Sequence, residues 1–113
     1  MIHIYIIVDP RDSRIFYVGQ TQDPKVRWAM HLSEAIHHTR GIISRKNERF
    51  TEIFSVFQMP LFVTIEVVSE RIADAREVYW YDLLKEAGAD LVNGSRPGAA
   101  HRKGNRRPPN WRA

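Results

Sequence analysis

His3–Thr21 carries the sequence HIYIIVDPRDSRIFYVGQT, which predicts two β-strands joined by a polar turn. Ile2–Val8 is rich in the β-branched and aromatic residues that are typical of strands. Asp9–Ser13 contains Asp, Pro and Ser, which favour a turn, and Ile15–Thr21 supplies the returning strand. A β-hairpin is therefore expected to open the chain.

Side chains alternate across a strand, so each strand of the hairpin has two faces. On the returning strand, alternation separates Phe16 and Val18 from Tyr17 and Gly19. A simple pairing of the two strands brings Tyr5 beside Tyr17. Gly19 has no side chain, so it would leave room beside the tyrosines for nucleic acid to approach the backbone.

The composition is that of one ordinary globular domain. The chain has 113 residues, of which 43% are apolar and 11% aromatic, enough for one modest core. It contains no cysteine, which excludes disulfides and thiolate zinc sites. No apolar run approaches the roughly 20 residues of a membrane span, and Ile2–Val8 is too short for the apolar region of a secretion signal. We therefore expect a soluble protein of the cytoplasm or nucleoid.

The net charge of +4 is unevenly distributed along the chain. Residues 96–113 hold six of the 17 basic residues and no acidic residue, so residues 1–95 hold 11 basic and 13 acidic side chains. This predicts a globular domain, residues 1–95, followed by a disordered basic tail, residues 96–113. The tail could bind nucleic acid through phosphate contacts and stacking, or it could only aid solubility. Its candidate contact residues are Arg102, Lys103, Arg106 and Arg107.

A helix is expected from Pro24 to about His37. Asp23 is a favoured N-cap and proline is a favoured first helical residue. Trp28, Leu32 and Ile36 recur every four residues and form the expected core stripe of this helix.

Basic residues gather on and after this helix. Arg27 and His31 lie one turn apart on a neighbouring stripe, where they could be a solvated flank or part of a site. The start of the next expected helix is crowded by four basic residues, Arg40, Arg45, Lys46 and Arg49. They could contact phosphates or simply keep a short helix soluble.

Ile42–Phe57 is expected to be helical in its later part, with an apolar stripe formed by Phe50, Ile53, Phe54 and Phe57. Leu61–Val68 is apolar at nearly every position, which predicts a strand that is central or covered on both faces. Both elements would enlarge the core that the hairpin begins.

A last helix is predicted at Glu70–Ala87, with Ser69 as its cap and Gly88 at its end. Its expected apolar stripe consists of Ile72, Ala75, Tyr79 and Leu83. Glu77 lies elsewhere, in line with Trp80 and other apolar residues. Such a carboxylate could reach out to water, or it could be a ligand for a hard cation held against the sheet.

Two triplets in the hairpin, His3-Ile4-Tyr5 and Tyr17-Val18-Gly19, resemble the signature of the GIY-YIG nuclease family. Two residues depart from the family pattern, since His3 replaces a glycine and Val18 replaces an isoleucine. Later positions that match the family, in order, are Arg27, His31, Glu77 and Asn93.

The resemblance implies an α+β fold in which a small three-stranded antiparallel sheet is flanked by helices, in the order β-β-α-(α)-β-α. It also implies an endonuclease that hydrolyses DNA phosphodiester bonds with one Mg²⁺ (or Mn²⁺) bound by Glu77. Arg27 would stabilise charge on the phosphate, and Asn93 would brace the site.

The identity of the catalytic base stays open at this level. Tyr5 would deprotonate or orient the attacking water, with Tyr17 positioning it. His31 is the rival base, because its ordinary pKa suits neutral pH.

The substrate is expected to be DNA, and the protein could act as a homodimer or with a recruiting partner. Contacts to DNA are expected at Gly19, Arg40, Arg45 and Lys46, and in the tail. The alternative function is a non-catalytic nucleic-acid-binding module of the same fold, which His3 in place of glycine would favour. A small interaction protein that uses its basic tail is a third interpretation.

Overall fold

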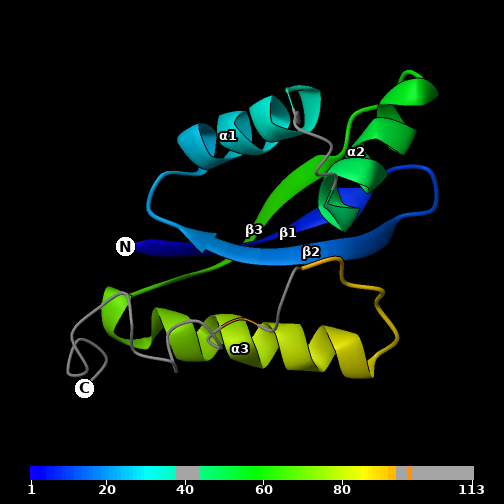
Figure 1. The fold of residues 1–113 in the computed structure, drawn as a ribbon. Coiled ribbons are helices and arrows are strands. Elements are labelled where there is room, and N and C mark those ends of the chain that lie inside the picture. The colour runs from blue at the N-terminus through cyan, green and yellow to red at the C-terminus, as the bar shows by residue number, and fades with distance from the viewer. Residues whose placement is uncertain (38–43, 94–96, 98–113) are drawn as a thin grey trace.

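The computed structural model describes residues 1–37, 44–93 and 97. Its elements are β1 (Ile2–Asp9), β2 (Arg14–Thr21), α1 (Pro24–Ile36), α2 (Arg45–Ser55), β3 (Leu61–Val68) and α3 (Glu70–Glu86). The strands form one antiparallel sheet in the order β2-β1-β3. The helices α1 and α2 cover one face of this sheet and α3 covers the other (Figure 1). The predicted α+β fold and element order are confirmed, whereas the predicted tail lies outside the described residues except for Pro97.

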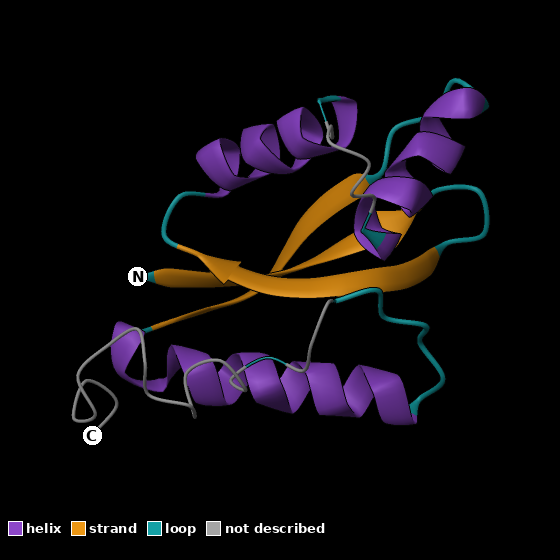
Figure 2. Ribbon diagram, viewed as in Figure 1, coloured by secondary structure: helices purple, strands orange, loops and turns teal. Residues whose placement is uncertain are grey.

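The sheet is a single layer between two layers of helix, and β1 is its central strand (Figure 2). Both faces of β1 are buried, so Ile4 and Ile7 are each 0% exposed. On the α3 face, Ile4 packs in a cluster with Val18 and Tyr81. On the α1/α2 face, Ile7 packs in a cluster with Phe50.

β3 is an edge strand, and the prediction that it is central or covered on both faces is wrong. Among the described residues it pairs with β1 alone, and Leu61, Val63 and Val67 are 51%, 41% and 46% exposed. The sequences of β1 and β3 are similarly apolar. Their order in the sheet is a property of the tertiary fold that local composition does not contain.

A β-bulge interrupts the simple alternation of β2. Ile7 pairs with Tyr17 but Val8 pairs with Ile15, so Phe16 is the extra residue. Phe16 therefore lies in the α1/α2 core, whereas Val18 lies in the α3 core. The expectation that Phe16 and Val18 share a face is wrong, because strict alternation ends at a bulge.

The start of α1 follows its sequence signals. The Asp23 side chain accepts a hydrogen bond from a backbone N–H of the first turn. Trp28 and Leu32 pack on the core as expected, but Ile36 is 62% exposed and the buried stripe instead includes His31. His31 and Ala35, four residues apart, are the buried residues of α1, so the buried stripe ends at Ala35 and Ile36 lies beside it on the exposed side.

The end of α2 explains why the apolar stripe predicted for this helix is partly wrong. α2 ends at Ser55, and Phe57 adopts a left-handed conformation with φ of 62° and is 98% exposed. Phe50 is buried as expected, but Phe57 leaves the helical stripe because the helix ends before it.

The two ends of α3 lie where the sequence predicts them. Ser69 occupies the N-cap of α3 without a side-chain cap bond to the described residues, and Gly88, with φ of 103°, follows the helix end as predicted.

The buried face of α3 differs from the predicted one. Ile72, Tyr79 and Leu83 are 45%, 47% and 42% exposed. The helix instead packs on the sheet through Tyr81, on the same side as Glu77. Two stripes of this helix are similarly apolar, and contact with β1 and β2 decides between them. None of the described helices is long and apolar enough to cross a membrane.

Candidate active site

Two tyrosines from the hairpin lie side by side, as the sequence predicts. The rings of Tyr5 (β1) and Tyr17 (β2) are stacked with centroids 6.3 Å apart. Phe62 of β3 lies against Tyr5, with ring centroids 4.2 Å apart. Tyr5 is 1% exposed, so its ring is fixed by packing from both neighbouring strands.

The space beside Gly19 is filled by Tyr5. These two residues face each other across the β1–β2 ladder. A Cβ atom at position 19 would collide with the hydroxyl oxygen and Cζ of Tyr5. The room that the glycine leaves is therefore used by the tyrosine itself, and contact of Gly19 with nucleic acid stays a prediction.

Two residues of α1 converge on the Tyr5 hydroxyl. The His31 Nε2 atom lies 2.7 Å from the Tyr5 oxygen, and Arg27 Nε donates to the same oxygen at 3.4 Å. His31 is 0% exposed. Because residues four apart on a helix share a face, α1 delivers both side chains to β1 together. The solvated-flank interpretation is therefore wrong for His31.

Lys46 extends this group from α2. Its Nζ lies 2.6 Å from Glu34 Oε1 and 3.0 Å from His31 Nδ1, and the residue is 8% exposed. Lys46 therefore points inward, although it was predicted as a phosphate contact. Its spacing of four residues from Phe50 is a signal that could have placed it on the buried stripe of α2.

Burial shifts the pKa values of the two candidate bases in opposite directions. Burial raises the pKa of Tyr5, the Tyr17 charge raises it further, and the hydrogen bond from Arg27 opposes both. Burial lowers the pKa of His31 to about 3, and the positive charges of Lys46 and Arg27 add to this effect. Both side chains are thus neutral at pH 7 in the free protein.

Glu77 forms a second polar group on the α3 side of β2. The Gln20 amide nitrogen donates to Glu77 Oε1 at 2.7 Å and to Asp74 Oδ1 at 2.8 Å. Burial raises the pKa of Glu77 to about 7, Gln20 opposes the shift, and the Asp74 charge adds to it. Asp74 and Glu77 lie three residues apart on α3 and are therefore neighbours on one face of the helix.

The two groups lie on opposite faces of β2. Consecutive residues of a strand point to opposite faces, and here Gly19 adjoins Tyr5 while Gln20 reaches α3. Figure 1 shows α1 and α3 on opposite sides of the sheet. The charge of Glu77 nevertheless raises the pKa of Tyr5, so the groups lie within electrostatic range across the strand.

Asn93 braces the outer edge of β2. Its Nδ2 donates to the Val18 carbonyl at 2.8 Å, and its Oδ1 accepts from the Val18 N–H at 3.3 Å. Val92 N–H donates to the Phe16 carbonyl at 2.8 Å. The segment after α3 therefore occupies hydrogen-bonding groups that a sheet edge would otherwise leave open.

A cleft of about 510 Å³ opens beside Tyr17 and Arg27. Glu34, Lys46 and Asn93 also line it. Its lining carries more positive than negative side chains, as an anionic ligand requires.

The other predicted contacts lie at the rim or outside the described residues. Arg45 lines the same cleft, and its guanidinium donates to Asp90 at 3.1 Å. The Nδ1 atom of His3, which stands at the position of the family glycine, lies 3.4 Å from Thr64 Oγ1 of β3. The predicted contacts that fall outside the described residues are Arg40, Arg102, Lys103, Arg106 and Arg107.

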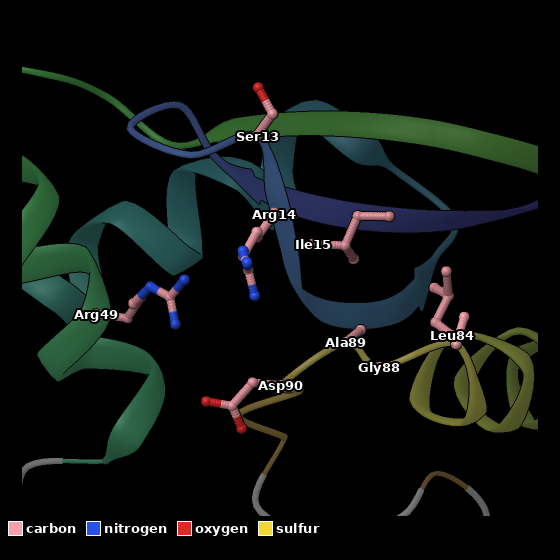
Figure 3. Close-up of a pocket in the computed structure, with 9 residues that line it drawn as sticks. Ser13, Arg14, Ile15, Arg49, Leu84, Gly88, Ala89 and Asp90 are labelled. Carbon is pink, nitrogen blue, oxygen red and sulfur yellow. The ribbon is translucent and has the colours of Figure 1, made fainter.

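A second pocket, of about 410 Å³, lies next to the hairpin turn. Figure 3 shows Arg14 and Arg49 extending toward the space between β2 and the segment after α3, with Asp90 across from them. Tyr17, Arg27 and Asn93, which line the first cleft, do not line this pocket, so the two are separate.

The donors around Glu77 fit a single hard cation. Within the described residues no group of three or more His, Cys, Asp or Glu side chains could hold a metal ion. Glu77 offers one carboxylate, and Asp74 offers a second beside the same amide group. Mg²⁺ suits such a site, because it keeps several waters and is usually bound by one or two carboxylates.

The model of the GIY-YIG catalytic domain matches residues 1–89. This range contains both triplets, the α1 pair and Glu77, and it ends before Asn93. No curated protein sequence and no solved structure matches the chain. The match covers well over half of the sequence and includes each helix and strand that the structure describes.

Proposed function

The chain belongs to the GIY-YIG catalytic-domain family, and we propose that it is a metal-dependent endonuclease that hydrolyses DNA phosphodiester bonds. Members of this family are endonucleases in general. The observation that carries the proposal is the convergence of His31 and Arg27 on the Tyr5 hydroxyl, next to a cleft that Arg27 and Tyr17 line. Glu77 lies across β2 from this group, within electrostatic range.

Arg27 is the candidate for binding the scissile phosphate. Its side chain lines the cleft and is 26% exposed, so a phosphate can reach it. A guanidinium forms strong, charge-assisted hydrogen bonds with phosphate oxygens and stabilises the charge that grows in the transition state. Arg45, at the rim of the same cleft, would bind a neighbouring phosphate.

Glu77 is the candidate for holding Mg²⁺ or Mn²⁺. Such a cation, when bound, neutralises phosphate charge and lowers the pKa of water. Gln20 orients the Glu77 carboxylate by a hydrogen bond of 2.7 Å. Because burial raises the pKa of Glu77 to about 7, cation binding must compete with a proton and weakens below that pH.

Tyr5 is the candidate for orienting and deprotonating the attacking water, with Tyr17 positioning it. Burial raises the pKa of Tyr5, whereas its hydrogen bond from Arg27 favours the phenolate. His31 is the rival base, although its pKa is lowered to about 3, mainly by burial and further by the positive charges of Lys46 and Arg27. The water oxygen bonds to phosphorus, the bond to the leaving oxygen breaks, and bulk water protonates that oxygen.

DNA is the proposed substrate, and the basic residues outside the described part would add phosphate contacts. A homodimer or a recruiting protein is proposed as well, because the cleft of the domain is modest in size. The exposed apolar residues Leu61 and Val63 of the edge strand β3 support this.

A non-catalytic nucleic-acid-binding module is the second candidate function. His3 in place of the family glycine favours it, as does the raised pKa of Tyr5. The basic cleft would serve either function.

The test is nicking of supercoiled plasmid in Mg²⁺, Mn²⁺ or EDTA by wild type, Glu77→Ala and Glu86→Ala. We expect cleavage by wild type that requires the cation, and a loss of about 100-fold or more in Glu77→Ala. Glu86→Ala is the matched control, since Glu86 is an exposed carboxylate on the same helix. It should cleave at the wild-type rate.

The outcomes separate the two candidate functions. Equal cleavage by wild type and Glu77→Ala would remove Glu77 from the site. Binding of plasmid and of branched DNA without cleavage of either would favour the binding module. Glu77→Gln checks folding, because removal of a buried carboxylate whose pKa is about 7 should raise the melting temperature of the metal-free protein at pH 8.

A further inference from the structure

Both ring nitrogens of His31 are engaged in the interior of the domain. Nε2 lies 2.7 Å from the Tyr5 oxygen, and Nδ1 lies 3.0 Å from Lys46 Nζ. A neutral imidazole carries one N–H and one acceptor nitrogen, so these two contacts must have opposite polarity. Whichever partner is fixed as a donor determines the tautomer of His31 and its chemical role.

Lys46 is the fixed partner. Its Nζ forms an ion pair of 2.6 Å with Glu34 Oε1, and an ammonium group in such a pair has donors and no acceptor. Nδ1 of His31 must then accept from Lys46. The single imidazole proton lies on Nε2, and His31 donates to the Tyr5 oxygen.

We propose that Lys46 is a positioning residue that holds His31 in the Nε2–H tautomer, so that His31 acts as a hydrogen-bond donor to Tyr5 and Tyr5 takes the role of base. This inference rests on the proposed function, and it decides between the two candidate bases. The charged and titratable groups that face His31 are Tyr5 of β1, Tyr17 of β2, Arg27 and Glu34 of α1, and Lys46 of α2.

In this tautomer the Tyr5 oxygen has two hydrogen-bond donors. Its oxygen accepts from His31 Nε2 and from Arg27 Nε, which both stabilise a phenolate. The hydroxyl proton then points away from both donors, and in the proposed reaction it passes to bulk water before the phenolate acts. The phenolate takes a proton from the attacking water, whose oxygen bonds to phosphorus while the bond to the leaving oxygen breaks. Bulk water protonates that oxygen.

The first measurement is the tautomer of His31, read from ¹⁵N chemical shifts of the two ring nitrogens in the metal-free, DNA-free protein. The chain has five histidines, so a His31→Gln variant assigns the signals. We expect wild type to carry the proton on Nε2. Lys46→Met should lose this preference and admit the Nδ1–H form, whereas Lys46→Arg, which keeps the donor, should restore it.

Arg45→Met is the matched control, because it removes the neighbouring cation, which pairs with Asp90 and not with His31. It should leave the tautomer unchanged. Should Lys46→Met fail to fold, Glu34→Gln keeps the lysine but removes its ion-pair partner, and it should increase the Nδ1–H fraction. An Nδ1–H tautomer in wild type, or no change in a folded Lys46→Met or Glu34→Gln, would overturn the proposal.

A kinetic measurement adds a second readout. Lys46→Met should lower kcat by about 10–100-fold, as loss of a supporting partner does. The tautomer is measured without turnover, so its result stands even if the nicking assay finds no nuclease. An active Lys46→Met with wild-type kcat would contradict a role for the tautomer in catalysis.

Discussion

Two buried polar clusters flank α2, and they differ in how fully their groups are satisfied. The Asp9 cluster, at the hairpin turn, consists of Asp9, Arg11 and Arg49. The Tyr5 cluster, at the cleft, consists of Tyr5, Arg27, His31 and Lys46. Each receives one cation from α2, and these two cations lie about one turn apart.

The Asp9 cluster is closed. The Asp9 carboxylate is 0% exposed and is surrounded by donors. Oδ2 accepts from the Arg11 guanidinium at 2.7 Å and from Arg49 at 2.9 Å, and Oδ1 accepts from the Arg11 backbone N–H at 2.9 Å. Arg49 also lies over the Phe16 ring, with its Cζ 5.0 Å from the ring centroid. Such a carboxylate holds the turn on α2 and has no acceptor left for a ligand.

The Tyr5 cluster is open on one side. Its members form hydrogen bonds to one another, but Arg27 and Lys46 also line the cleft. A positive side chain that lines a cleft and donates to a neutral hydroxyl keeps capacity for an anion. The comparison indicates that a cluster whose hydrogen-bonding groups are all occupied has a structural role. A cluster that can still form hydrogen bonds to an anion in a cleft has a functional role.

The largest expected effect is loss of stability in Asp9→Asn. The variant leaves two arginines without their shared carboxylate, and breaking a buried ion pair lowers the free energy of unfolding by about 3–5 kcal/mol. Urea unfolding measures the change. Asp12→Asn is the matched control at the same turn, because the Asp12 side chain is 44% exposed and its loss should cost less than about 1 kcal/mol. A near-wild-type Asp9→Asn would mean that the closed cluster does not hold the turn.

The pH dependence of stability tests the same cluster by its charge. Hydrogen bonds from Arg11 hold the pKa of Asp9 well below its usual range. The folded state therefore binds fewer protons than the unfolded chain, whose Asp pKa is about 3.9. The stabilisation is complete above about pH 5 and is lost as the pH falls below that value. The difference between wild type and Asp9→Asn should shrink from pH 5 to pH 2, and a constant difference would contradict this origin.

The comparison also shows what the sequence can predict. The hairpin, the Tyr5–Tyr17 pair and the Arg27–His31 pair depend on spacing within one element or across one tight turn. Such spacings fix which side chains share a face. These parts of the site agree with the structure for that reason. Glu77 was singled out because it interrupts an otherwise apolar stripe.

The errors share a different cause. Lys46 was expected at the surface, and Asp74 and Gln20 were not linked to Glu77. The contacts of Lys46 with His31 and of Gln20 with Glu77 join elements that are distant in the sequence, so periodicity within one element cannot determine them. Asp74 is different, because it lies three residues from Glu77 on the same helix and its helical spacing could have linked the two. The edge position of β3 and the bulge at Phe16 likewise depend on strand order and register. Gln20 is therefore a residue that was missed because it supports Glu77 from another element of the fold.

The next expected effect concerns Gly19 and the Tyr5 cluster. Gly19→Ala adds a Cβ that collides with the Tyr5 ring and must displace it. Overpacking of this kind costs about 1–3 kcal/mol, and a small misplacement of a catalytic group costs up to about 100-fold in rate. Cleavage rate and urea unfolding together measure the two effects. Arg14→Ala, on the same strand with a side chain 75% exposed, should change neither, and full activity in Gly19→Ala would show that Tyr5 need not lie where it does.

The smallest expected effects come from the rim carboxylates of the two clusters, Glu52 and Glu34. Their side chains are 56% and 47% exposed, so both Glu52→Gln and Glu34→Gln should change the free energy of unfolding by less than about 1 kcal/mol. The two variants should differ in their rates of DNA cleavage. Within the described residues, the Glu52 side chain forms an ion pair with the closed cluster alone, through Arg11 at 3.3 Å, so its variant should cleave DNA at the wild-type rate. Glu34 holds Lys46, so its variant should cleave more slowly, by up to about tenfold. Equal rates in the two variants would erase the functional distinction between the clusters, even though their stabilities agree.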